Sequence, residues 1–131
     1  MVIVHFWASR KDAIIDYLLS PIRANKKRLL ALGYEIKIFY DPSPKLLSCN
    51  ILALISKTVL RSMQEKSAVC PEDGPTISFL KKARQRVDKI IWFDTADSTS
   101  VTHFELLPFI DLYLKKQIFQ DKSLYQKKFL I

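Results

Sequence analysis

Short runs of apolar residues recur along the chain, separated by segments in which apolar residues repeat at helical spacing. The runs at 2–7, 50–55 and 89–93 are almost continuously apolar, a pattern typical of strands buried on both faces of a sheet. The runs at 34–40 and 110–114 alternate between apolar and polar residues, which predicts strands with one mixed face at the edges of the sheet. The pattern therefore predicts five strands, with the second and the fifth at the edges.

Helical patterns lie between most of these strands. They cover residues 12–19, 21–32, 57–64 and 76–87. Proline cannot continue a hydrogen-bonded helix but suits its first turn, so the first two helices are expected to be separated at Ser20 and Pro21. Gly33 follows the second helix and is expected to end it in the left-handed conformation.

The alternation of strands and helices predicts the fold class. We expect an α/β domain with a three-layer, Rossmann-like or flavodoxin-like architecture and a mainly parallel sheet. Edge positions for the second and fifth strands favour the strand order 2-1-3-4-5 over 3-2-1-4-5. The length of 131 residues suits one domain, and 49% hydrophobic residues exclude a disordered chain. Residues 1–131 are therefore interpreted as a single Rossmann-like domain.

The start of the chain and its charge bear on location and partners. No apolar run approaches the roughly 20 residues of a membrane-spanning helix. The apolar start has no basic leader and is interpreted as a strand, so a cytoplasmic location is expected. The net charge is +8, but the basic residues form short clusters without interleaved aromatic residues, which disfavours nucleic acid as a partner. Two interpretations of the charge stay open: it binds the anionic inner face of a membrane, or it only keeps the protein in solution.

The residue types disfavour several kinds of catalytic and cofactor site. Gly33 and Gly74 are the only glycines, which disfavours a phosphate-binding or dinucleotide-binding loop, and there is no Gly-x-Ser-x-Gly motif of a hydrolase. Cys49 and Cys70 form no Cys-x-x-Cys pair, and the two histidines have no metal-binding spacing. Reduced, metal-free thiols and no cofactor are therefore predicted. His103 is expected to be structural, with the role of general base as the alternative.

One group of charged residues is predicted to meet at the rim of the sheet. In an open parallel sheet, ligands bind beyond the carboxyl ends of the strands. By this rule the candidate ligand-binding residues are Arg10, Asp94, Asp97 and Lys115. Carboxylates at this rim can accept hydrogen bonds from hydroxyl groups of a ligand. In the alternative interpretation the two aspartates cap the following segment, or pair with Arg10 or nearby lysines.

Three stretches of the chain resemble the N-terminal part of bacterial glycosyltransferases of the GT-B type. They are ALGYEIKIFYDPS (31–43), KIIWFDTADST (89–99) and PFIDLYLKKQIFQDKSLY (108–125). In such proteins a helix ends at a glycine and leads into a strand, and later a strand ending in aspartates precedes one of the form Asp-x-Tyr-x-Lys-Lys. The glycine-rich first loop of many members is replaced here by Ala8, Ser9 and Arg10.

The resemblance implies a function and a partner domain. GT-B enzymes have two Rossmann-like halves, of which the N-terminal half meets the acceptor and the C-terminal half binds the nucleotide sugar. The chain is then expected to be the acceptor-side half of a longer glycosyltransferase, inactive alone, with a glycan or lipid-linked acceptor. The competing hypothesis is a stand-alone flavodoxin-like module that binds a protein partner or an anionic surface.

Overall fold

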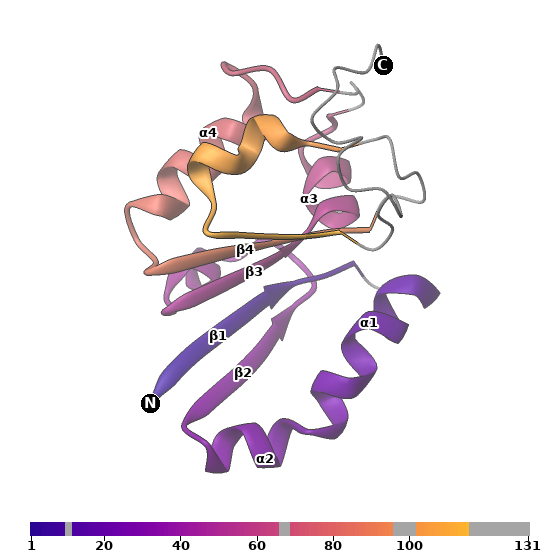
Figure 1. Ribbon diagram of the computed structural model, residues 1–131, viewed down its shortest axis with the longest axis vertical. Helices are drawn as coiled ribbons and strands as arrows, with labels where there is room; N and C mark the ends of the chain where they lie inside the picture. The colour runs from indigo at the N-terminus through magenta and orange to yellow at the C-terminus, as the bar shows by residue number, and fades with distance from the viewer. Residues whose placement is uncertain (10–11, 66–68, 96–101, 116–131) are drawn as a thin grey trace, which may run out of the picture.

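The sheet has the architecture expected from the apolar runs. A computed structural model of the chain describes residues 1–9, 12–65, 69–95 and 102–115 (Figure 1). Five strands form one sheet in the order β2-β1-β3-β4-β5, and every adjacent pair is parallel. The strands are β1 (Val2–Trp7), β2 (Tyr34–Phe39), β3 (Ile51–Ile55), β4 (Lys89–Asp94) and β5 (Leu112–Lys115). The predicted α/β class, the parallel sheet and the order 2-1-3-4-5 are confirmed.

Helices cover both faces of this sheet. They are α1 (Ala13–Ala24), α2 (Lys26–Ala31), α3 (Ser56–Ser62) and α4 (Pro75–Arg84), with the 3-10 helices η1 (Pro44–Leu47) and η2 (Phe104–Phe109). Figure 1 shows α1 and α2 on one side of the sheet and α3 and α4 on the other. Phe6 of β1 packs with Ile15 of α1 in one apolar core, whereas Trp92 of β4 packs with Leu80 of α4 in the other. The sheet is therefore covered by helices on both faces, which gives a three-layer α/β domain with one apolar core on each side of the sheet.

The expected helix break at Ser20 and Pro21 is wrong, because α1 continues through Pro21 to Ala24. Proline has no backbone N–H, so the carbonyl group four residues earlier loses its hydrogen bond within the helix. Pro21 is exposed, so this carbonyl group lies on the solvent side of α1, where water can donate the missing hydrogen bond. The break lies at Asn25 instead, whose side-chain amide donates to the carbonyl of Pro21 at 2.7 Å. A short polar side chain that competes for a backbone carbonyl disturbs a helix locally.

Gly33 makes the turn from α2 into β2. Its φ of +95° lies in the region that favours glycine, as the sequence predicts. Its carbonyl accepts a hydrogen bond from the backbone N–H of Val2 at 2.7 Å. The turn therefore brings the start of β2 beside the start of β1, which sets the register Val2 to Tyr34.

Asp111 fastens the edge strand β5 to the rest of the domain. Its carboxylate accepts the backbone N–H of Ile90 at 2.8 Å and receives the guanidinium group of Arg84 on both oxygens. Burial acts to raise the pKa of Asp111, but the hydrogen bonds from Ile90 and Arg84 outweigh it, and the pKa lies below its ordinary value. The ionised form is therefore the one that holds β5.

Asp111→Ala is expected to lower the free energy of unfolding by about 1–3 kcal/mol at pH 7, since it removes charge-assisted hydrogen bonds. A depressed carboxyl pKa contributes stability above the unfolded-state pKa of about 4, and this contribution is lost as the pH falls through the folded-state value. The difference in the free energy of unfolding between the variant and the parent, measured in urea, should therefore be larger at pH 7 than at pH 3. Glu72→Ala, which replaces an exposed acid, is the control. An equal difference at both pH values would contradict the role of the charge.

Candidate functional site

A hollow lies at the carboxyl ends of β4 and β5, beside α1. Its volume is about 410 Å³. The lining residues are Tyr17, Leu18, Phe93, Asp94, Thr95, Leu114 and Lys115. This is the edge at which open parallel sheets bind their ligands. Two of the four residues predicted for a ligand site, Asp94 and Lys115, line the hollow, and the other two, Arg10 and Asp97, lie outside the described residues.

Asp94 and Lys115 are direct neighbours across the last two strands. They are paired in the register of β4 and β5, and the Lys115 Nζ lies 3.2 Å from the Asp94 Oδ2. The side chains are 4% and 0% exposed for Lys115 and Asp94, respectively. The phenol of Tyr113 also donates a short hydrogen bond to this oxygen, and burial together with that bond raises the pKa of Tyr113. Asp94 is therefore the centre of a buried polar group, as the pairing interpretation predicts.

Hydroxyl groups join the carboxyl ends of the neighbouring strands. Thr95 donates its backbone N–H to the Ser56 Oγ at 3.0 Å, and the two hydroxyl groups lie 3.2 Å apart. Beyond β1, the Ser9 hydroxyl lies 2.8 Å from that of Thr58. These contacts connect the ends of β1, β3 and β4. These four residues were not among the predicted site residues, although small polar residues directly after buried strands are the signal that could have found them.

The wall of the hollow toward α1 is apolar and open. Tyr17 of α1 is 84% exposed, and Leu114 of β5 is 39% exposed. Phe93 of β4 is half-buried beside them. Phe93 also packs against the apolar core that α1 shares with the sheet. The hollow thus combines an apolar wall with the buried charged pair, an arrangement suited to a ligand with one apolar face and several polar groups.

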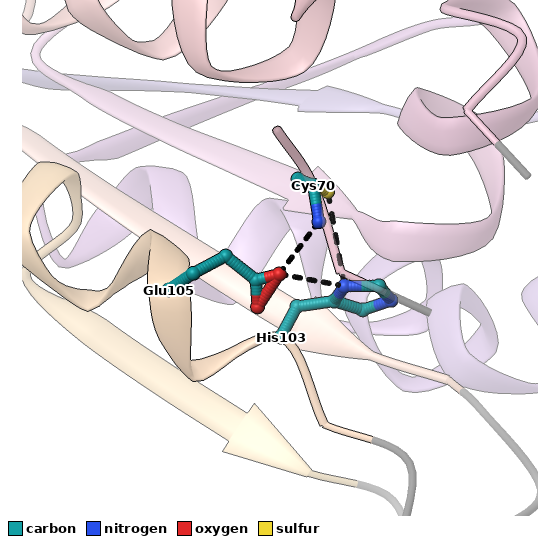
Figure 2. Close-up of side chains that lie close together, drawn as sticks. All are labelled: Cys70, His103 and Glu105. Carbon is teal, nitrogen blue, oxygen red and sulfur yellow. Dashed lines mark hydrogen bonds and ion pairs between the residues drawn. The ribbon is translucent and has the colours of Figure 1, made fainter. Parts of the chain in front are cut away.

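A second cluster forms where the loop before α4 meets the start of η2 (Figure 2). The Cys70 Sγ lies 3.7 Å from the Nδ1 of His103, and the Glu105 Oε2 lies 3.3 Å from the same nitrogen. Glu105 also accepts the backbone N–H of Cys70 at 2.7 Å. The hydrogen bond to Cys70, followed by that to Glu105, raises the pKa of His103 to about 10. The ring of His103 is not part of the hollow, so the general-base role finds no support in the geometry of that site.

Both cysteines are free thiols, but their surroundings differ. Cys49 is half-buried, and burial raises its pKa to about 11, which keeps it protonated and unreactive. Cys70 lies in the cluster with His103 and Glu105, whose potential ligand atoms all lie within 4.8 Å of one another. Motif spacing in the sequence does not reveal this cluster, because Cys70 and His103 are 33 positions apart.

The fold and the hollow define a class: a five-stranded, flavodoxin-like α/β domain whose candidate ligand site lies at the carboxyl edge. Comparisons of the chain with protein-family models, with curated proteins and with solved structures found no match. Among the described helices, none has the length and apolar character needed to cross a membrane.

Proposed function

We propose that the chain is the acceptor-side domain of a GT-B-type glycosyltransferase, which moves a sugar from a nucleotide-sugar donor to a glycan or lipid-linked acceptor. The observation that carries this proposal is the composition of the hollow. Phe93, Asp94 and Thr95 come from one of the stretches that resemble GT-B enzymes, and Leu114 and Lys115 come from another. Two of the resembling stretches therefore contribute residues to a single hollow at the carboxyl edge of the sheet.

The chemistry of the hollow suits a sugar acceptor. A sugar ring has an apolar face, which can stack on the exposed ring of Tyr17, and hydroxyl groups, which need partners at the other end. The hydroxyl group of Thr95 and the ammonium group of Lys115 lie at that end of the hollow. Asp94 is fully buried and accepts hydrogen bonds from Tyr113 and Lys115, so its part in the site is to hold Lys115 at the rim.

The nucleotide sugar is assigned to a C-terminal donor-binding domain, because the chain has no glycine-rich phosphate loop. The chain by itself is therefore expected to show no glycosyl transfer and only weak binding of nucleotide sugars. Calorimetric titration of the 131-residue chain with a nucleotide sugar tests this expectation. Micromolar affinity would overturn the assignment, since it would require a donor site within these residues.

Tyr17→Ala is expected to weaken acceptor binding about tenfold, because covering one face of an aromatic ring contributes about 1.4 kcal/mol. The stability of the fold should hardly change, since the side chain is 84% exposed. NMR titration with short oligosaccharides measures the affinity and is expected to shift the signals of Thr95 and Lys115. Tyr34→Ala, at the opposite edge of the sheet, is the matched control. Equal affinity of parent and Tyr17→Ala would contradict the proposed acceptor surface.

A basic surface on α1 and α2 favours the second candidate function, contact with an anionic surface. Its exposed cations are Arg23, Lys26, Lys27 and Arg28. Leu30 and Leu32 beside them are 48% and 73% exposed. Such a combination of cations and apolar side chains suits the headgroup region of an anionic membrane. Binding to vesicles with and without anionic lipid tests it, and equal binding to both would count against this candidate.

A further inference from the structure

We infer that Cys70, His103 and Glu105 form a binding site for a transition-metal ion, and that zinc is the metal whose chemistry fits them best. The three side chains supply one sulfur, one nitrogen and one oxygen ligand, which are the donor types that zinc takes in proteins. They come from the loop before α4 and from the start of η2 (Figure 2). None of the three residues lines the hollow, and the inference does not depend on the proposed glycosyltransferase function.

Two of the three distances between donor atoms in the cluster match those of a tetrahedral ligand set. With zinc bond lengths of about 2.3 Å to sulfur and about 2.0–2.1 Å to nitrogen and oxygen, tetrahedral geometry places sulfur and nitrogen about 3.6 Å apart and nitrogen and oxygen about 3.3 Å apart. The Sγ of Cys70 and the Oε2 of Glu105 lie 3.7 Å and 3.3 Å from the Nδ1 of His103. All three donor atoms lie within 4.8 Å of one another, so a side-chain movement of about 1 Å is enough for them to bind one ion.

Hydrogen bonding alone explains this arrangement poorly. The Nδ1 of a histidine has one position for a proton or a bond, yet two partners, the Cys70 sulfur and the Glu105 oxygen, approach it. One N–H group shared between two acceptors makes two bent and weaker hydrogen bonds. A metal ion bonded to Nδ1 contacts both at once. Binding releases the protons of the thiol and of Nδ1 to solvent, and it leaves a thiolate and a carboxylate that balance the 2+ charge of zinc.

The surroundings support the ligands. Cys70 and His103 are 3% and 5% exposed, and the side chain of Glu105 is 20% exposed, so solvent can reach the cluster beside Glu105 and supply a water molecule as the fourth ligand. The backbone N–H of Cys70 holds the Glu105 carboxylate at 2.7 Å. The backbone N–H of His103 donates to the Tyr113 hydroxyl group at 3.1 Å. Such second contacts orient metal ligands and strengthen binding.

The test uses the full chain, purified under reducing conditions and freed of metal with a chelator. We expect one zinc ion per chain by elemental analysis after dialysis against Zn²⁺, and a higher melting temperature than in the metal-free protein. With Co²⁺ as the probe, we expect a thiolate-to-cobalt charge-transfer band and visible bands of tetrahedral intensity. Absence of both the zinc ion and the cobalt bands in the parent chain overturns the inference without any variant.

Variants then assign the ligands. Cys70→Ser, His103→Ala and Glu105→Gln should each weaken zinc binding by more than about 10–100-fold, which is the cost of losing a residue that only hydrogen-bonds to a metal ligand. Glu105→Gln retains an oxygen that can accept the N–H of Cys70, so the fold is expected to survive. Cys49→Ser is the matched control, because Cys49 lies outside the cluster, and it should bind zinc like the parent. Unchanged zinc affinity in Cys70→Ser and Glu105→Gln would show that the ion binds elsewhere and would overturn the inference.

Discussion

Lys115→Met is expected to lower the free energy of unfolding by about 3–5 kcal/mol, because it removes one member of a buried ion pair and leaves the carboxylate of Asp94 buried without the charge of Lys115. Both side chains are almost fully buried, and their charged atoms are 3.2 Å apart. Tyr113 still donates to the carboxylate, but a phenol carries no positive charge to balance it. The same loss is expected to open the polar end of the hollow, since Lys115 lines it.

Urea unfolding at pH 7 measures this loss. Lys82→Met, at an exposed position on α4, is the control and should change stability by less than about 0.5 kcal/mol. The double variant Asp94→Leu with Lys115→Met should recover part of the stability, because no unbalanced charge is then buried. Equal stability of Lys115→Met and the control would mean that the pair is hydrated in solution.

The same geometry changes the expectation for Asp94→Asn. A helix-capping aspartate tolerates asparagine, because the amide oxygen can accept the same hydrogen bond. Asp94 instead is the last residue of β4 and balances the buried charge of Lys115. Asparagine is therefore expected to destabilise the fold, so any effect of this variant on ligand binding must be compared with its effect on stability.

Trp92→Ala is expected to lower the free energy of unfolding by about 3–5 kcal/mol, the range for removing a large aromatic side chain from a core. Trp92 lies on β4 in the middle of the core between the sheet and α4, with none of its surface exposed. Its indole N–H has no hydrogen-bond partner in the described part of the chain. Packing, and not a polar contact, therefore accounts for its contribution.

Trp92→Phe separates the two contributions, since phenylalanine keeps most of the apolar volume and removes the unpaired N–H. We expect it to cost well under half of the loss in Trp92→Ala. Circular dichroism in urea is the suitable measurement, because Trp7 contributes to fluorescence in every variant. Equal losses in both variants would show that the indole N–H has a partner in solution.

Much of the fold could be predicted from the sequence, because the apolar pattern records how strongly each strand is buried. Continuous apolar residues at 2–7 mark a strand covered on both faces, and alternation at 34–40 marks an edge strand, which together led to the correct order. The predicted helix break at Pro21 was wrong. Whether a proline breaks a helix depends on whether it faces solvent, and this orientation is determined only when the helix packs on the sheet.

The candidate site was likewise predictable from the sequence only in part. Asp94 and Lys115 could be predicted from the sequence as residues at the carboxyl ends of strands, since the parallel sheet brings these ends to one edge. Only the tertiary structure joined them into a buried pair with Tyr113, because that contact depends on the register of β4 and β5. The tertiary structure also brings Cys70, His103 and Glu105 together. Short-range spacing cannot reveal ligands that meet only when the loop before α4 packs against η2.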